Sequence, residues 1–105
     1  MINKKTKVCF SGPRILTDEQ FKIVKNITKK YHDYFEKDNY HLIYNVGDAS
    51  GVDAVVYKTL SELYNNDFIK KFKVKDKTKK QAYAQRSMRM VSDTTVADDS
   101  YLIAF

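Results

Sequence analysis

Short runs of β-branched and aromatic residues alternate with segments of helical periodicity from one end of this 105-residue chain to the other. The spacing predicts strands over 7–10, 41–46, 68–74 and 100–105, and helices over 17–36, 52–65 and 78–93 between them. Such alternation favours right-handed crossovers between parallel strands, with helices on both faces of the sheet. We therefore expect a Rossmann-like α/β sandwich with a mostly parallel sheet of about four strands.

The size and composition of the chain limit what it can be. Its 105 residues have room for one domain, 1–105, and the 43% hydrophobic and 30% charged content is typical of a soluble globular protein. No apolar run approaches the roughly 20 residues that cross a bilayer. We expect a cytoplasmic protein without a membrane partner.

Cysteine and histidine are too sparse for metal or disulfide chemistry. Cys9 is alone, which excludes an internal disulfide, and its apolar neighbours predict a small buried side chain rather than a nucleophile. His32 and His41 have no companion at metal-ligand spacing, so we expect both at the surface or at an edge. The sequence thus predicts no metal and no cofactor.

The predicted helices carry recognisable caps and stripes. Thr17 and Gln20 have the spacing of a capping box at the start of the first helix. Helical spacing assigns apolar stripes to the first and third helices, and Met88 is also expected in the core. The stripes are Phe21, Val24, Ile27, Tyr31 and Tyr34 in the first helix, and Ala82, Tyr83, Arg86 and Met90 in the third.

The segment 45–53 lies where the second predicted strand ends and the second helix begins. We expect Gly47 and Gly51 to allow positive φ angles and a close approach of the backbone to a ligand. Ser50 and Asp53 place side-chain oxygens at the start of the helix. The segment fits an anion or sugar site, and it also fits an ordinary tight turn with a helix cap.

Two further segments should meet this one, because loops at the carboxyl ends of parallel strands converge on one crevice. The turn 11–14 offers Arg14, and the third helix offers Arg86 from the side. Guanidinium groups and helix N-termini suit a phosphate, and Asp48 or Asp53 suits ribose hydroxyls. The predicted ligand-binding residues are Ser11, Gly12, Pro13, Arg14, Gly47, Asp48, Ala49, Ser50, Gly51, Asp53 and Arg86.

Each of these side chains also has a structural interpretation. Arg14 could cap its own loop or pair with Asp18, and Arg86 could pair with a carboxylate on a helix surface. Asp53 could act only as a first-turn acid that favours the helix dipole. No nucleotide-binding loop of the ATPase type, no dehydrogenase glycine motif and no nucleophile elbow is present, and no catalytic residue is assigned.

Four motifs, in order, resemble the SLOG superfamily, in particular its YspA-like (cpYpsA-related) group. They are Phe10-Ser11-Gly12-Pro13-Arg14, Gly47-Asp48-Ala49-Ser50-Gly51-Val52-Asp53, Arg86 with Met90, and Leu102-Ile103-Ala104-Phe105. The resemblance implies a Rossmann-like fold that binds a nucleotide-derived ligand, such as a nucleotide, an ADP-ribose or NAD-related molecule, or a cyclic nucleotide signal. It spans nearly the whole chain.

Two departures from the family pattern qualify this resemblance. Ser87 stands where the family usually has asparagine, and the sequence lacks the P-G-G-x-G-T-type loop that follows the last strand in many relatives. In relatives that cleave nucleoside monophosphates, that loop supplies a phosphate cradle and a catalytic glutamate. We therefore expect sensing or sequestration rather than turnover, in a phage or bacterial conflict system.

Two alternative functions remain open, and the chain is also expected to assemble with copies of itself. A nucleotide hydrolase of phosphoribohydrolase type is the enzymatic alternative. A module that binds single-stranded nucleic acid is the other, because the resemblance includes SLOG relatives that bind single-stranded DNA. The lysines crowded into 70–80 are suitably charged for this, although a solvated strand edge also explains them. We also expect a homo-oligomer whose second copy completes or covers the sheet.

Overall fold

The computed structural model describes residues 5–37, 41–75 and 81–105. Its four strands are β1 (Lys5–Ser11), β2 (His41–Gly47), β3 (Ile69–Phe72) and β4 (Asp99–Ala104), arranged in the order β3-β2-β1-β4. Every neighbouring pair is parallel. The helices are α1 (Asp18–Glu36), α2 (Val52–Leu63) and α3 (Ala82–Thr95), with a short 3-10 helix η1 (Asn66–Phe68). The predicted Rossmann-like α/β sandwich is confirmed.

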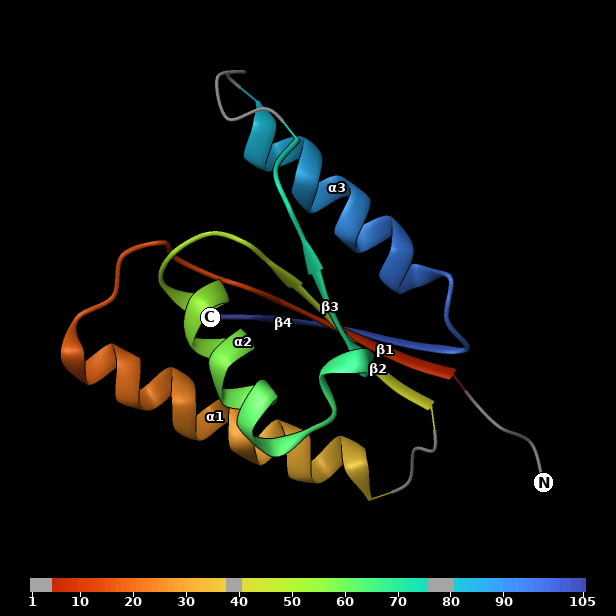
Figure 1. The fold of residues 1–105 in the computed structure, drawn as a ribbon, viewed down its shortest axis with the longest axis horizontal. Helices are drawn as coiled ribbons and strands as arrows, with labels where there is room; N and C mark the ends of the chain where they lie inside the picture. The colour runs from red at the N-terminus through yellow and green to blue at the C-terminus, as the bar shows by residue number, and fades with distance from the viewer. Residues whose placement is uncertain (1–4, 38–40, 76–80) are drawn as a thin grey trace.

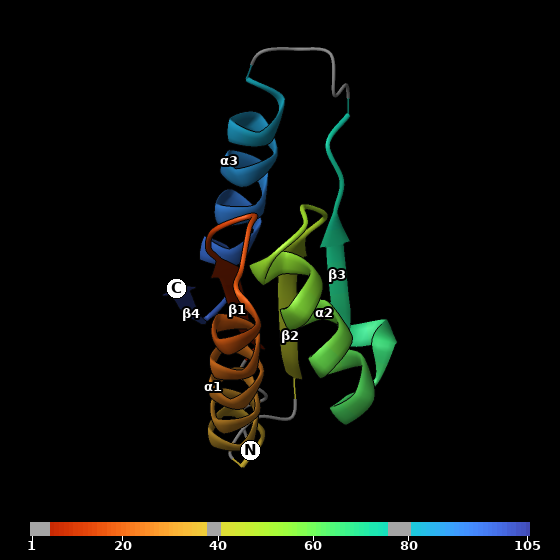
Figure 2. The ribbon, with the colours of Figure 1, turned by 90° about the vertical axis from the view of Figure 1, so that its left-hand side faces the viewer.

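The helices form two layers around the sheet. Helices α1 and α2 pack together on one face, and α3 covers the other face (Figures 1 and 2). The main apolar core lies between the sheet and the α1–α2 layer. It includes Val8, Phe10, Leu42, Tyr44 and Val56, all of which are fully buried. No helix in the described ranges is long and apolar enough to cross a bilayer.

Helix α1 begins as predicted but buries a different stripe. The Thr17 hydroxyl accepts a hydrogen bond from the amide of Gln20, whose side chain accepts one from the amide of Thr17, so the capping box is confirmed. Of the predicted stripe, Val24 is buried and Ile27 is half-buried, but the three aromatic residues are not. The buried residues are Val24, Thr28, His32 and Phe35, whereas three of the predicted ones, Phe21, Tyr31 and Tyr34, are exposed.

Local hydrogen bonds explain how polar residues replace aromatic ones on this face. The Thr28 hydroxyl donates to the Val24 carbonyl, and His32 Nδ1 lies 2.7 Å from the Tyr44 hydroxyl. A polar side chain can be buried when it has such a partner. The prediction that His32 lies at the surface is therefore wrong, because only 2% of it is exposed. His41 is exposed, as predicted.

The two outer strands differ from their predictions. The start of the third predicted strand forms η1, and β3 covers only Ile69–Phe72. The uninterrupted apolar run of β4 is typical of a strand inside a parallel sheet, but β4 lies at the outer edge beside β1, with Leu102 59% exposed. An apolar run indicates a strand but does not say how many neighbours it has. Met88 is also exposed, whereas Met90 is buried as predicted.

Some predictions fall outside the described ranges. The first residues of the predicted third helix, 78–80, are among them, as are the lysines at 77, 79 and 80. The described lysines of this run, Lys70, Lys71, Lys73 and Lys75, are all exposed, which agrees with a solvated strand edge.

A polar layer joins α3 to the sheet. Asp93 of α3 accepts hydrogen bonds from Lys7 Nζ of β1 at 3.0 Å and from Asn45 Nδ2 of β2 at 2.9 Å. The same amide of Asn45 donates to the Thr94 hydroxyl at 2.9 Å. Because Lys7 and Asn45 come from adjacent strands, this layer fixes where the C-terminal half of α3 lies on the sheet.

The Asp93 carboxylate should make stability depend on pH. Burial alone would raise its pKa, but hydrogen bonds from Lys7 and Asn45 and the charges of Lys7 and Lys70 outweigh it, so the pKa falls below 3.8. A lowered pKa in the folded state stabilises the fold above the unfolded value and loses this effect as pH falls through the folded value.

We predict that Asp93→Asn destabilises the protein by about 1–3 kcal/mol at neutral pH, because Lys7 then loses its charged partner. The deficit relative to wild type should shrink as pH falls below 3.8, the ordinary value for this carboxyl. Urea unfolding across the pH series measures it. Glu62→Gln, which changes an exposed carboxylate on α2, is the control. A deficit that does not vary with pH would contradict the prediction.

Candidate functional site

The turns after β1 and β2 are hydrogen-bonded to each other. The amide of Val52 donates to the Pro13 carbonyl at 3.0 Å, and the Ser50 hydroxyl donates to the Arg14 carbonyl at 2.9 Å. The amide of Phe105, just after β4, donates to the Ser11 carbonyl at 2.9 Å. The structure thus brings the predicted segments 11–14 and 47–53 together at the carboxyl ends of the strands.

The two glycines of the second turn have different roles. Gly51 has φ 75°, and a Cβ there would lie 2.4 Å from the Pro13 carbonyl oxygen, so close contact between the turns requires glycine. Gly47 does not have the predicted positive φ, since Gly51 is the glycine of the described ranges that does. A Cβ on Gly47 would instead lie 1.6 Å from Arg86 Nη1. Gly47 provides space for a guanidinium.

Arg86 is buried behind this turn. Its Nη1 donates to Asp53 Oδ2 at 3.1 Å and to Asp48 Oδ1 at 3.4 Å. Asp53 Oδ2 also accepts from the Ala49 amide at 3.2 Å, and Asp48 Oδ2 accepts from the Val74 amide at 3.0 Å. This Arg86–Asp48–Asp53 cluster connects α3, the 47–53 turn, the start of α2 and the segment after β3.

These contacts bear on the roles expected for the cluster. Arg86 and Asp53 are each 5% exposed, and both carboxylates already accept hydrogen bonds. The alternative in which Arg86 pairs with a carboxylate therefore agrees with the contacts, although its partners belong to the turn and to buried α2 rather than to a helix surface. A contact between either aspartate and a ribose hydroxyl stays a prediction.

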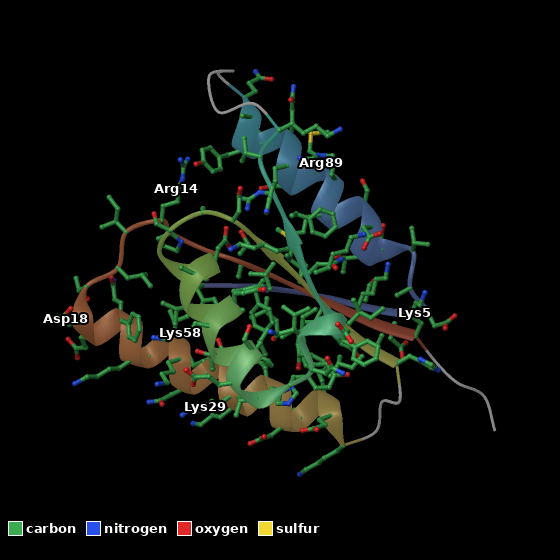
Figure 3. All side chains as sticks on the ribbon, viewed as in Figure 1. Lys5, Arg14, Asp18, Lys29, Lys58 and Arg89 are labelled. Carbon is green, nitrogen blue, oxygen red and sulfur yellow. The ribbon has the colours of Figure 1, made fainter. Side chains whose placement is uncertain are left out.

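Arg14 is the exposed cation of the site. Its guanidinium carbon lies 4.3 Å from the centre of the Tyr83 ring, and that of Arg86 lies 5.6 Å from the same centre. Figure 3 shows Arg14 well away from Asp18, so the structure does not support the alternative in which these two residues pair. The sequence predicted Tyr83 as part of the apolar stripe of α3 but not as a neighbour of Arg14 in the candidate site. Its position three residues before Arg86 on one helix was the available signal.

The remaining predicted residues surround Arg14. Ser11, Gly12, Pro13 and Ser50 are exposed, and Ala49 is buried beneath the turn. Helix α2 has Gly51 at its N-cap and no side-chain cap, so the site combines Arg14 with the positive end of a helix dipole. This combination favours an anionic group above the turns.

Cys9 and the cavity beside it lie elsewhere. Cys9 lines a cavity of about 230 Å³ together with Val91, Thr94 and Leu102, between β4 and the C-terminal half of α3. Burial raises the pKa of Cys9 to about 11, so the thiol is protonated at neutral pH. The prediction of a small buried side chain is confirmed. Residues 5–37, 41–75 and 81–105 contain no group of three or more potential metal ligands.

The fold and the site define a parallel α/β sandwich with a buried arginine–carboxylate cluster below an exposed arginine. Comparison of the chain with protein-family models, with curated proteins and with solved structures finds no match.

We predict that Gly47→Ala destabilises the fold by about 1–3 kcal/mol, because the new methyl group would displace the Arg86 guanidinium from its carboxylates. Arg86→Lys keeps the charge but lacks Nη1, so Gly47→Ala should cost at least about 1 kcal/mol less in that background. Chemical denaturation of all four proteins gives the double-mutant cycle. Equal costs in the two backgrounds would show that Gly47 does not make space for Arg86.

Proposed function

We propose that this protein is SLOG-like and binds a nucleotide-derived ligand at the turns after β1 and β2. The observation that carries the proposal is the guanidinium of Arg14, an exposed residue of two mutually hydrogen-bonded turns beside the N-terminus of α2, which has no side-chain cap. The order of the four SLOG-like motifs supports the same conclusion. The ligand is a nucleotide, an ADP-ribose or NAD-related molecule, or a cyclic nucleotide signal.

The charges around the site make Arg14 the decisive group. In the Arg86–Asp48–Asp53 cluster one guanidinium pairs with two carboxylates, so the formal charge of the cluster is negative. Arg14 is the cation on the solvent side. A phosphate above the turns would pair with Arg14, whereas without this side chain it would face a negative cluster.

We propose binding without turnover, in sensing or in sequestration within a phage or bacterial conflict system. A general base must be free to accept a proton from its substrate or from water. Asp48 and Asp53 both accept hydrogen bonds from Arg86 and from backbone amides, which holds them in place as structural anchors. Release of free base from a nucleoside monophosphate by the purified protein would instead favour the hydrolase alternative.

We predict that adenosine monophosphate, ADP-ribose or a cyclic dinucleotide raises the melting temperature of the wild-type protein. Arg14→Ala should weaken binding of the active probe at least about tenfold, which corresponds to about 1.4 kcal/mol. Isothermal titration calorimetry measures the affinity. Lys29→Ala, which removes a positive charge from α1 far from the turns, is the control and should bind as wild type does (Figure 3). No stabilisation by any probe, or equal affinity of Arg14→Ala, would overturn the proposal.

The nucleic-acid alternative rests on a different surface. Lys70, Lys71 and Lys73 are exposed along and just after β3, at the other edge of the sheet from β4. Phosphate contacts by such lysines make affinity strongly dependent on salt. Salt-sensitive binding of an oligonucleotide that survives Arg14→Ala, but is lost when these three lysines become glutamine, would support this alternative.

We also propose that a second copy of the chain pairs along β4. The outer strand β3 is short and carries exposed Lys70 and Lys71, which discourages edge-to-edge pairing. Residues 100–105 carry no charged side chain, and Tyr101 and Leu102 are exposed on opposite faces of β4. Antiparallel pairing of two β4 strands about a two-fold axis would cover the unprotected edge and place Leu102 of each copy at the seam.

For this chain, sedimentation velocity should show a dimer for the wild type and a monomer for Leu102→Lys, because a charge at the seam opposes pairing. Leu63→Lys is the control, since Leu63 is also an exposed leucine but lies on α2. It should not change the dimer. A wild-type protein that is monomeric at every concentration, or an unchanged dimer in Leu102→Lys, would contradict the pairing.

A further inference from the structure

We propose that Tyr83 is a stacking platform for a planar aromatic group of the ligand. Arg14 lies over this ring in the structure, and on binding Arg14 would move to the phosphate and leave the ring to the base. The inference rests on the proposed function and narrows it. The site should take a phosphorylated nucleoside in preference to a sugar phosphate of the same charge.

Two guanidinium groups lie near the Tyr83 ring, but only one of them is free to leave. The Arg86 guanidinium, 5.6 Å from the ring centre, is buried and bound to Asp48 and Asp53. The Arg14 guanidinium, 4.3 Å from the ring centre, belongs to an exposed residue. Tyr83 itself is half-buried in the first turn of α3. The ring is therefore partly enclosed by the protein, and the guanidinium that lies over it at the shorter distance belongs to the exposed Arg14.

Hydrogen bonds hold the backbone around Arg14 in place. The Arg14 carbonyl accepts a hydrogen bond from the Ser50 hydroxyl, and the preceding carbonyl, of Pro13, accepts one from the amide of Val52. Movement of Arg14 away from Tyr83 therefore requires only rotation about side-chain bonds, while the turn keeps its shape. The start of α2 and the guanidinium stay on the same side of the site throughout.

The strengths of the competing contacts favour this exchange. A cation–π contact at an exposed position is weak, whereas guanidinium and phosphate form charge-assisted and often bidentate hydrogen bonds. A bound phosphate therefore competes well for Arg14. Once Arg14 has left, a nucleobase can stack on the ring face that Arg14 covered. Every base has a π face that stacks on an aromatic ring, so this contact replaces the lost cation–π contact.

Calorimetry with adenosine monophosphate and ribose 5-phosphate tests the platform, because the two probes share a phosphate and differ in the base. Wild type should bind the nucleotide at least about tenfold more tightly than the sugar phosphate. Tyr83→Leu should remove most of this preference, and Tyr83→Phe, which keeps the ring, should retain it. Arg14→Ala should weaken both probes.

The movement of Arg14 has a separate readout. The chain contains three arginines, Arg14, Arg86 and Arg89, so the arginine Nε–H signals in an NMR spectrum are few and can be assigned from substitutions. The Arg14 signal should shift with either phosphate probe, whereas adenosine alone should shift it much less. The Arg86 signal, which belongs to the buried cluster, should change little with any probe.

The outcomes separate the two proposals. If neither phosphate probe nor any nucleotide tested above binds, the proposed function fails and the platform fails with it. If both probes bind with equal affinity, or if Tyr83→Leu keeps the preference for the nucleotide while remaining folded, the platform is wrong and phosphate binding at Arg14 stands. An Arg14 signal that does not move when phosphate binds would overturn the exchange.

Discussion

The interaction of Arg86 with Asp48 and Asp53 is the constraint on which the arrangement of the turns at the carboxyl end of the sheet depends. Arg86 Nη1 lies 3.1 Å from the Asp53 carboxylate of α2 and 3.4 Å from the Asp48 carboxylate of the turn. Those carboxylates hold the amides of Ala49 and Val74. A buried charge is costly unless it is paired, so these groups specify one another's positions. Gly47 belongs to the same arrangement because it leaves room for the guanidinium.

Arg14 and Arg86 both lie near the Tyr83 ring but differ in their surroundings. Arg86 is buried and pairs with two carboxylates, whereas Arg14 is exposed to solvent. A rigid turn beneath a movable cation is a suitable arrangement for recognising a phosphate, because the groups that position the ligand lose little freedom on binding. The two functional proposals above depend on this division between a fixed and a mobile arginine.

The two faces of the sheet are held by different kinds of contact. Toward α1 and α2 the core is apolar, apart from partnered polar groups such as His32. Toward α3 the contacts include Asp93, Asn45 and Lys7 at the C-terminal half of the helix and Arg86 nearer its start. Paired charges at both ends place α3 on the sheet, which keeps Tyr83 and Arg86 next to the turns after β1 and β2.

The order and type of the elements were predictable from the sequence alone, because hydrophobic period and capping residues are local properties; the Thr17–Gln20 box and the strands through Phe10 and Tyr44 are examples. The convergence of 11–14 and 47–53 also followed from the carboxyl-end rule for parallel sheets. Only the tertiary structure decided that His32 is buried, that β4 is an edge strand, that Gly47 makes room for Arg86, and that Tyr83 lies under Arg14. Each of these depends on which residues from distant parts of the chain become neighbours, and periodicity along one segment does not contain that information.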